Sequence, residues 1–288
     1  MKIPGLIYTG ILKWLDKHGS DESYIKWMFY HRLGYWPNLK FPMTFNEKMN
    51  WIKLYDKNPK FIEYADKYTV RQHIKEVMGE EYLIPLLGVY ERAEDIDFTV
   101  LPNRFVLKCN NGAGFNLICK DKSRLNTSEA IAKLNKWLKT DFSRGKREWY
   151  YKEIPPKILC ESYMEDKQSD TLFDYKVFCI GGKVQFIQVD FDRFSDHKRN
   201  IYDCDWNLLD WGINFPRDEK RVVEKPSELS NMIKFSELLS SEFRQLRADF
   251  YVINDHLYFG EMTFFTGGGF TNFIPREKDR QYGDMLIL

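Results

Sequence analysis

Two short apolar runs separated by a glycine-bearing turn constrain the fold of this chain more than any other feature of its sequence. The first run covers residues 105–108 and the second residues 115–119, with Asn-Gly-Ala-Gly at 111–114 between them. Apolar runs of four or five residues bounded by turn residues are typical of buried strands, because a helix needs ten residues or more. We therefore expect a strand, a loop and a second strand here.

The first hundred residues show helical signals instead. Ser20 is a candidate cap for a helix that ends before Gly34, and residues 44–47 read Thr-Phe-Asn-Glu, the spacing of a capping box. Residues 61–78 carry apolar side chains at helical spacing and are followed by glycine, which predicts a third helix. We interpret residues 1–100 as a helical N-terminal region, so the fold class is α+β.

Strand and helix patterns alternate in the rest of the chain. A polar stretch at residues 165–170 is a candidate hinge, which predicts one lobe over residues 101–165 and a second over 166–288. The two residues Gly181 and Gly182 suit a tight hairpin turn. The expected elements are a helix from Asn126 to 138, a strand at 158–160, a hairpin of 174–180 with 183–190, a helix over 228–246 capped by Ser227, and a final hairpin of 249–253 with 257–262.

Composition excludes several classes of protein. The chain has 288 residues, with 43 Lys and Arg against 42 Asp and Glu, so no global basic field favours nucleic acid. Five cysteines without a CxxC pair indicate reduced thiols and a cytoplasmic location. No apolar run is long enough to span a membrane, and the N-terminus lacks a signal-peptide cleavage pattern. Peripheral contact with the inner face of a membrane remains open.

Lys108 and the glycines of the turn form the first candidate site. Glycine lets backbone N–H groups approach an anion closely, and a lysine supplies a cation, so Lys108, Gly112 and Gly114 are candidates for phosphate binding. The turn does not match G-x-x-x-x-G-K-[ST], and the strand after it excludes a dinucleotide fingerprint. A hairpin whose glycines serve turn geometry alone fits the same residues.

Lys108 itself is expected on an apolar strand between Leu107 and Cys109. A charged lysine there is costly unless an anion is near, so we expect a phosphate partner from a ligand. The alternatives are a salt bridge to a core carboxylate or a side chain that reaches the sheet edge. Without a partner in the chain, Lys108→Met would keep or slightly raise thermal stability while weakening binding of the phosphate ligand.

Asp249 and Glu261 form the second candidate site. If a three-residue loop at 254–256 joins their strands, the two carboxylates face each other across the hairpin, whereas a two-residue loop would put them on opposite faces. Opposed carboxylates need a cation between them, and Mg²⁺ is commonly held by one or two carboxylates together with phosphate oxygens. Arg247, on the same strand parity as Asp249, would supply a further cation. Two solvated carboxylates are the alternative interpretation.

Other catalytic motifs are missing from the sequence. The five histidines form no HExxH and no pairing with cysteine at metal-binding spacing, and no G-x-S-x-G is present. The sequence therefore gives no support for a covalent serine or cysteine mechanism. We expect chemistry that needs no protein nucleophile.

Five motifs taken in order resemble the ATP-grasp superfamily, and more closely its branch associated with teichuronopeptide and capsular polysaccharide biosynthesis. The resemblance covers most of the chain, from about residue 27 to 271. Its carriers are Ala-Asp-Lys-Tyr-Thr-Val-Arg at 65–71, Phe-Val-Leu-Lys-Cys-Asn-Asn-Gly-Ala-Gly at 105–114, Leu-Cys-Glu-Ser-Tyr-Met at 159–164, Asp-Tyr-Lys-Val-Phe at 174–178, and Arg-Ala-Asp-Phe-Tyr at 247–251 with Gly-Glu-Met-Thr at 260–263.

The resemblance implies an ATP-grasp fold, in which two α+β lobes grip a nucleotide behind the helical N-terminal region. It assigns phosphate contacts to Lys67, Lys108 and Lys176, a mobile loop over the nucleotide to Gly112 and Gly114, adenine recognition by backbone groups to Glu161, Ser162, Tyr163 and Met164, and Mg²⁺ ligands to Asp249 and Glu261. Many members carry Glu-x-Asn at the last strand. Thr263 stands there instead, so a second metal position is filled by a hydroxyl, by water, or not at all.

The implied reaction is ATP-dependent carboxylate–amine ligation through an acylphosphate, with Arg247 and Lys176 neutralising charge on the transferring phosphoryl group. For this branch the resemblance implies a uronic acid or amino acid as the carboxylate substrate and an amide on a surface polysaccharide precursor as the product. A glycosyltransferase using a nucleotide sugar, a non-catalytic polysaccharide-assembly protein and a kinase remain alternatives. The acceptor and the oligomeric state are not predicted.

Overall fold

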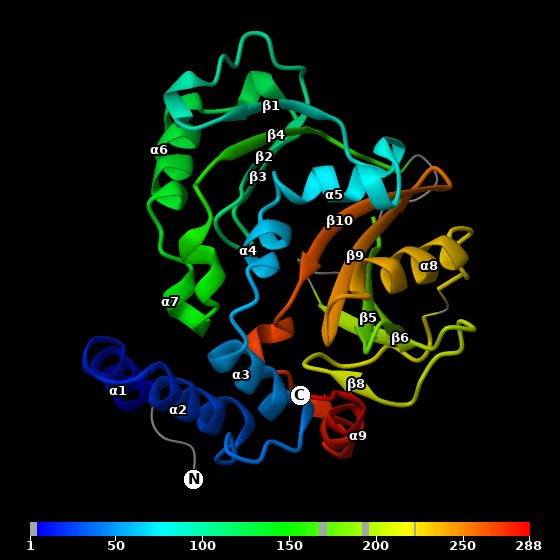
Figure 1. Cartoon of the computed structure of the whole chain (residues 1–288). Coiled ribbons are helices and arrows are strands. Elements are labelled where there is room, and N and C mark those ends of the chain that lie inside the picture. Colours follow the sequence, from blue (N-terminus) through cyan, green and yellow to red (C-terminus); the bar gives the residue numbers. More distant parts are fainter. Residues whose placement is uncertain (1–4, 167–171, 192–195, 222) are drawn as a thin grey trace.

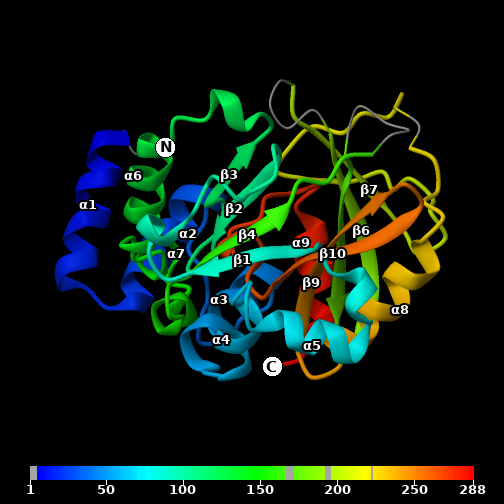
Figure 2. The ribbon, with the colours of Figure 1, turned by 90° about the horizontal axis from the view of Figure 1, so that it is seen from above.

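The computed structural model describes residues 5–166, 172–191, 196–221 and 223–288, and its strands form two larger antiparallel sheets. Figure 1 shows the two sheets in separate parts of the molecule, with helices α4 (Lys60–Ala65) and α5 (Val70–Val77) between them. Figure 2, seen from above, shows helix α1 (Gly5–His18) at one end of the molecule and α8 (Leu229–Ser240) at the opposite end. The predicted hinge falls largely on residues outside the described ranges.

The first sheet contains the predicted strand pair. Its order is β1-β4-β2-β3, made of β1 (Leu86–Tyr90), β4 (Ile158–Ser162), β2 (Phe105–Cys109) and β3 (Asn116–Cys119). Helix α6 (Thr127–Leu138) begins at the cap Asn126 as predicted and packs its buried Leu134 into the core of this sheet. Strand β1 lies within the first hundred residues, so the prediction that this region is wholly helical is wrong. Pairing with β4 across 70 residues makes it a strand.

The second sheet forms the larger part of the core. Its order is β10-β9-β5-β6-β7, made of β10 (His256–Thr263), β9 (Gln245–Ile253), β5 (Asp174–Ile180), β6 (Lys183–Phe191) and β7 (Lys198–Tyr202). Gly181 and Gly182 both have positive φ, as a tight hairpin turn requires, so that prediction is confirmed. The predicted helix over 228–246 is too long, because α8 ends at Ser240 and β9 begins at Gln245. Ser227 does not cap it and instead bonds Asp255.

The N-terminal helices are α1 (Gly5–His18), α2 (Asp21–Leu33) and α3 (Phe45–Tyr55). The side chain of Ser20 accepts a hydrogen bond from the Ser23 amide, and the capping box of Thr44 and Glu47 is complete, so both predicted caps are confirmed. Helix α3 packs against α9 (Glu277–Met285) near the C-terminus. Helix α3 therefore shares a core with the second sheet, whereas the buried side chains of α1 and α2 form a separate, smaller cluster.

The predicted helix over residues 61–78 is divided. It consists of α4 and α5, with residues 66–69 between them. Asp66 ends α4, and its carboxylate accepts hydrogen bonds from the Tyr68 amide and from Asn110 Nδ2, both at 2.8 Å. Aspartate that bonds nearby backbone competes with helix formation. Because Asn110 is distant in sequence, helical periodicity alone could not reveal this break.

Short elements complete the fold. They are α7 (Ser143–Lys146), the paired strands β8 (Gly212–Ile213) and β11 (Phe273–Ile274), and the 3₁₀ helices η1 (Glu80–Tyr82), η2 (Ala93–Asp95), η3 (Lys122–Arg124), η4 (Trp149–Glu153) and η5 (Thr266–Gly268). All five cysteines are free thiols. Among the helices formed by the described residues, none combines the length and the apolar character that crossing a bilayer requires.

Candidate active site

A cavity of about 380 Å³ is lined by both larger sheets and by the chain between α4 and α5. Eight of the residues singled out in the sequence line it: Lys67, Lys108, Gly114, Glu161, Lys176, Arg247, Asp249 and Glu261. Gly112, Ser162, Tyr163 and Met164 are not among the lining residues. The structure thus gathers most of the predicted site from segments that span 195 positions of the sequence.

The hairpin of β9 and β10 brings Asp249 opposite Glu261 by an unexpected route. The turn contains two residues, Asn254 and Asp255, both with positive φ, so the three-residue loop on which the facing arrangement was conditional does not form. A two-residue turn alone would have placed the carboxylates on opposite faces. A β-bulge at Gly260 shifts the register by one residue, and Glu261 then pairs with Asp249. Both carboxylates consequently face the same cavity.

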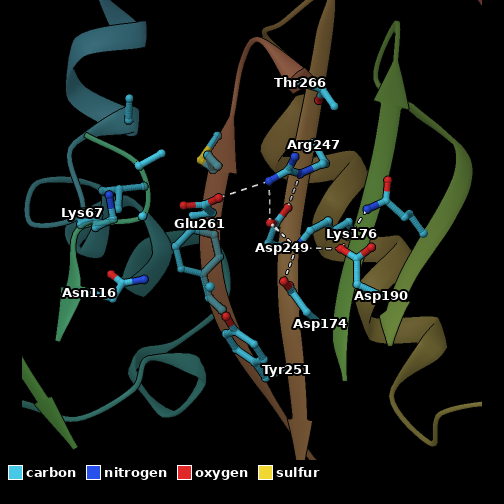
Figure 3. A pocket seen from close by; sticks show the side chains of 18 of the residues that line it. Lys67, Asn116, Asp174, Lys176, Asp190, Arg247, Asp249, Tyr251, Glu261 and Thr266 are labelled. Carbon is cyan, nitrogen blue, oxygen red and sulfur yellow. Dashed lines mark hydrogen bonds and ion pairs between the residues drawn. The ribbon is translucent and has the colours of Figure 1, made fainter. Parts of the chain in front are cut away.

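Arg247 lies between the two opposed carboxylates (Figure 3). Its Nε and Nη2 donate to the two oxygens of Asp249 at 2.6 and 2.7 Å, and Nη2 lies 3.2 Å from Glu261 Oε1. Burial alone would lower the pKa of Arg247, but the two carboxylates outweigh it and raise that pKa. The cation required between these carboxylates is therefore supplied by the chain itself.

Lys176 is buried on β5 among three carboxylates, as Figure 3 shows. Its Nζ contacts Asp174, lies 3.1 Å from Asp249 Oδ2 and 4.0 Å from Asp190 Oδ2. Three carboxylates around one ammonium offset part of the cost of burying it. Lys176 thus links the metal-ligand candidate Asp249 to strand β6.

Asp190 and Arg199 line the cavity but were not singled out in the sequence. Arg199 Nε lies 2.5 Å from Asp190 Oδ1, and His197 Nε2 lies 3.2 Å from the same oxygen. Burial would raise the pKa of Asp190, but Arg199 and Lys176 outweigh burial and lower it. The two residues are register partners on β6 and β7, so their opposite charges on neighbouring strands were the signal that could have identified them.

Lys67 lies in the segment between α4 and α5 and contacts the glycine loop. Its Nζ donates to the Gly112 carbonyl at 2.6 Å. Burial lowers the pKa of Lys67, opposed by Glu261. A Cβ on Gly112 would lie 2.6 Å from the Phe115 ring, and Gly114 has a φ of +77°, so both positions require glycine. The loop covers one end of the cavity with Gly114 on its wall.

Lys108 has a partner within the chain, contrary to the first expectation. Its Nζ lies 2.6 Å from Glu161 Oε2, and Arg71 Nη1 lies 3.3 Å from the other oxygen of Glu161. Glu161 lies on β4 as the register partner of Val106, two residues before Lys108 on β2, which brings its carboxylate beside Lys108. The salt bridge, one of the alternatives above, is the arrangement present without a nucleotide. The expected gain in stability from Lys108→Met is therefore wrong.

The predicted adenine-binding segment continues from the end of β4. The Ser162 amide donates to the Pro85 carbonyl, and the Arg104 guanidinium lies 5.2 Å from the centre of the Tyr163 ring. Arg104 also forms two bonds of 2.6 Å with Glu165. These contacts order the segment, while its role toward adenine stays a prediction.

The carboxylates fit one kind of metal site. Asp249 and Glu261 are the two donors that face each other, and Thr263 Oγ1 lies 3.4 Å from Glu261 Oε1. Within the described ranges, no cluster of three or more His, Cys, Asp or Glu side chains could hold a metal ion by itself. Two carboxylates suit a Mg²⁺ ion that takes its remaining oxygens from phosphates and water.

Comparison with known proteins decides the family. The model of the family described as TupA-like ATP-grasp matches residues 47–287, which is most of the chain. The chain belongs to the TupA-like ATP-grasp family. The fold is an α+β fold of the ATP-grasp type. Two antiparallel sheets line the cavity, and helices precede them in the sequence. No match was found among curated proteins.

Solved structures resemble this ATP-grasp chain at low identity. D-alanine–D-alanine ligase from Bacillus anthracis, complexed with ATP, is 17% identical with a TM-score of 0.40, covering 70% of this chain and 53% of the ligase. Phosphoribosylamine–glycine ligase from Thermotoga maritima is 13% identical with a TM-score of 0.44, covering 73% and 52%. D-alanine–D-alanine ligase from Helicobacter pylori is 13% identical with a TM-score of 0.42, covering 84% and 69%. The chain spans about half the length of the first two structures.

Proposed function

We propose that this protein is an ATP-dependent carboxylate–amine ligase that forms ADP through an acylphosphate. The observation that carries the proposal is the cavity itself, where Lys67 and Lys108 face a wall that holds Lys176, Arg247 and two opposed carboxylates. These four cations, together with Arg71 and Arg199 on the same cavity, suit a triphosphate, because phosphoryl transfer depends on positioning and on neutralised charge. Membership of the TupA-like ATP-grasp family supports the same chemistry.

In this proposal Lys67 and Lys108 hold the nucleotide phosphates beneath the glycine loop. Arg247 and Lys176 act at the transferring phosphoryl group, where their charges stabilise the developing negative charge on its oxygens. A carboxylate oxygen of the substrate attacks the γ-phosphorus of ATP, and ADP leaves as the acylphosphate forms. The amine then attacks the carbonyl carbon of the acylphosphate, loses a proton and expels phosphate, which leaves the amide. No nucleophile from the chain takes part, which agrees with the absence of nucleophile motifs in the sequence.

Asp249 and Glu261 would hold Mg²⁺ from the face of the last hairpin. When bound there, Mg²⁺ would neutralise negative charge on the phosphoryl group that is transferred. Arg247 contacts both carboxylates and would keep them oriented while the ion arrives with the nucleotide. Thr263 lies beside Glu261, and its hydroxyl or a water molecule would fill a second metal position if a second ion binds.

The substrates we propose are a sugar acid or amino acid and an amine, which together give an amide on a surface polysaccharide precursor such as that of a bacterial capsule. The family description, TupA-like, supports this branch of the superfamily. A small or lipid-linked saccharide carboxylate would meet the enzyme in the cytoplasm or at the inner face of the membrane.

The proposal is tested by a screen for ADP release. Uronic acids are combined with amino acids in the presence of ATP and Mg²⁺, and hydroxylamine replaces the amine in parallel reactions, because an acylphosphate is trapped as a hydroxamate. We expect ADP and amide with at least one pair, hydroxamate with the same acid, and no product from Asp249→Asn. ADP with a phosphorylated alcohol would indicate a kinase. Release of nucleoside diphosphate from a sugar nucleotide would favour a glycosyltransferase.

A further inference from the structure

One end of the cavity is formed by a turn with unusual backbone geometry. Thr266 and Gly267 line the cavity, and Gly267, Gly268 and Gly269 have φ values of +61°, +73° and +77°. Three consecutive left-handed residues are strained for any residue with a side chain. We call residues 266–269 the glycine turn, and it follows β10, which carries Glu261.

Helix α3 holds the glycine turn and the residues after it from one face. Asn46, Asn50 and Lys53 are four and three positions apart, so they lie on the same side of the helix. Asn46 Nδ2 donates to the Thr271 carbonyl at 2.8 Å and Asn50 Nδ2 to the Gly269 carbonyl at 2.7 Å. Lys53 Nζ donates to the Gly268 carbonyl at 2.6 Å.

Lys53 differs from its two neighbours because it brings a charge into the core. Its exposed fraction is 1%, and its ammonium lies 4.7 Å from the centre of the Phe270 ring. Burial lowers the pKa of Lys53 to about 7, opposed by the buried carboxylate of Glu148. Asn46 and Asn50 show that a neutral amide suffices to bond a carbonyl here. A buried lysine costs more than a neutral amide, so its use at the Gly268 carbonyl indicates that the position of this carbonyl matters to the site.

Thr266 supplies the second observation. Its side-chain Oγ1 is buried and has no hydrogen-bond partner in the described part of the chain, and the residue is only 5% exposed on the cavity wall. A buried hydroxyl without a partner is destabilising, so its retention points to a ligand group that completes it. Figure 3 shows Thr266 beyond Arg247, on the side away from Tyr251.

We propose that Thr266 contacts the carboxylate substrate and that Lys53 is a positioning residue, which holds the Gly268 carbonyl and so directs Thr266 toward Arg247. This inference rests on the proposed ligase activity and assigns the acid to the end of the cavity formed by the glycine turn. A hydroxyl donor beside a guanidinium suits a carboxylate, which accepts from both. Lys53 itself touches no substrate.

Three variants of the full chain test the proposal. Lys53→Met removes the ammonium at similar length, and Thr266→Val removes only the hydroxyl. Lys48→Met is the matched control, because Lys48 also lies on α3 and its Nζ donates to a backbone carbonyl, that of Leu286 at 2.8 Å, far from the glycine turn in sequence. Thr266→Val keeps the test decisive if Lys53→Met fails to fold.

The first measurement is amide hydrogen exchange, which is independent of activity. We expect exchange across residues 267–270 to be at least tenfold faster in Lys53→Met and unchanged in Lys48→Met. Unchanged exchange in Lys53→Met would overturn the role given to Lys53. This result stands even if the screen above finds no acid, in which case the ligase proposal alone fails.

The second measurement separates the acid from the nucleotide. With D-glucuronate as the acid and L-glutamate as the amine, we expect the KM for D-glucuronate to rise at least tenfold in both Lys53→Met and Thr266→Val. The ATP dissociation constant should stay within twofold of wild type, and kcat should fall less than kcat/KM. Equal weakening of ATP and D-glucuronate, or normal kinetics in Thr266→Val, would contradict the assignment of this end of the cavity.

Discussion

Each cation that we propose for the nucleotide already has an oxygen partner in the chain. Lys67 donates to the Gly112 carbonyl, Lys108 pairs with Glu161, and Arg247 with Asp249 and Glu261. These contacts keep buried or half-buried charges satisfied before any ligand arrives. When a triphosphate binds, its oxygens must therefore replace these carbonyl and carboxylate oxygens as partners of the cations. At the residue scale, stability and affinity depend on the same side chains.

Lys108→Met tests this dependence. Glu161 would keep only Arg71 at 3.3 Å, so we expect the free energy of unfolding to fall by about 2 kcal/mol, between the values for exposed and buried pairs. ATP affinity should also fall. Chemical denaturation and calorimetry measure the two effects. A double-mutant cycle with Glu161→Gln provides the control, and additive losses would show that the salt bridge contributes nothing.

Lys53 gives the stability of the protein a pH dependence. Its pKa is lowered to about 7 in the folded chain, whereas the unfolded chain has the ordinary value near 10.5. As pH falls from about 10 to about 7, the unfolded state takes up a proton that the folded state does not, so stability decreases. We expect the free energy of unfolding of Lys53→Met, relative to that of wild type, to rise by more than about 1 kcal/mol as pH falls over this range. Parallel stability curves for the two proteins would contradict this shift.

At the scale of elements, the sequence was sufficient to predict helix caps and a tight turn, because these features depend on residues close together in the chain. Ser20, Thr44 and the Gly181-Gly182 turn act on neighbours within four residues, and sequence predicts them correctly. The break after α4 depends on Asn110, 44 residues away, and strand β1 exists through pairing with β4. The hairpin illustrates both cases, because its turn has two residues rather than the three on which the facing arrangement was conditional, and Asp249 nevertheless pairs with Glu261.

Gly260 explains why Asp249 pairs with Glu261 although the turn of the hairpin has only two residues. A Cβ there would lie 3.0 Å from the Asp249 carbonyl and 3.2 Å from the Tyr251 ring, so glycine permits the bulge. Gly260→Val should cost roughly 1–3 kcal/mol of stability and move Glu261 away from Asp249. Thermal unfolding and the Mg²⁺ dependence of nucleotide binding measure this. Gly10→Ala is the control, because a Cβ there meets nothing within 4 Å, and it should be neutral or slightly stabilising, since Gly10 lies inside helix α1 where alanine is favoured over glycine.

At the scale of the whole molecule, the site draws on segments from Lys53 to Gly268. Helix α3 contributes to the same core as the second sheet and supports the glycine turn, although the sequence placed it in a separate N-terminal region. Hydrophobic periodicity predicts which residues are buried, but not which distant segments they meet. Motif order, supplied by the resemblance to ATP-grasp proteins, predicted the cavity better than any pattern of apolar residues did.

The central claim is that the cavity binds ATP together with Mg²⁺. The most direct test is calorimetric titration of the full chain with ATP, with Mg²⁺ and with EDTA, beside the Asp249→Asn and Glu261→Gln variants. We predict saturable binding of ATP that weakens at least tenfold without Mg²⁺ and in both variants, whose thermal unfolding shows that they are folded. No heat with ATP and Mg²⁺, alongside clear binding of a sugar nucleotide, would contradict the account.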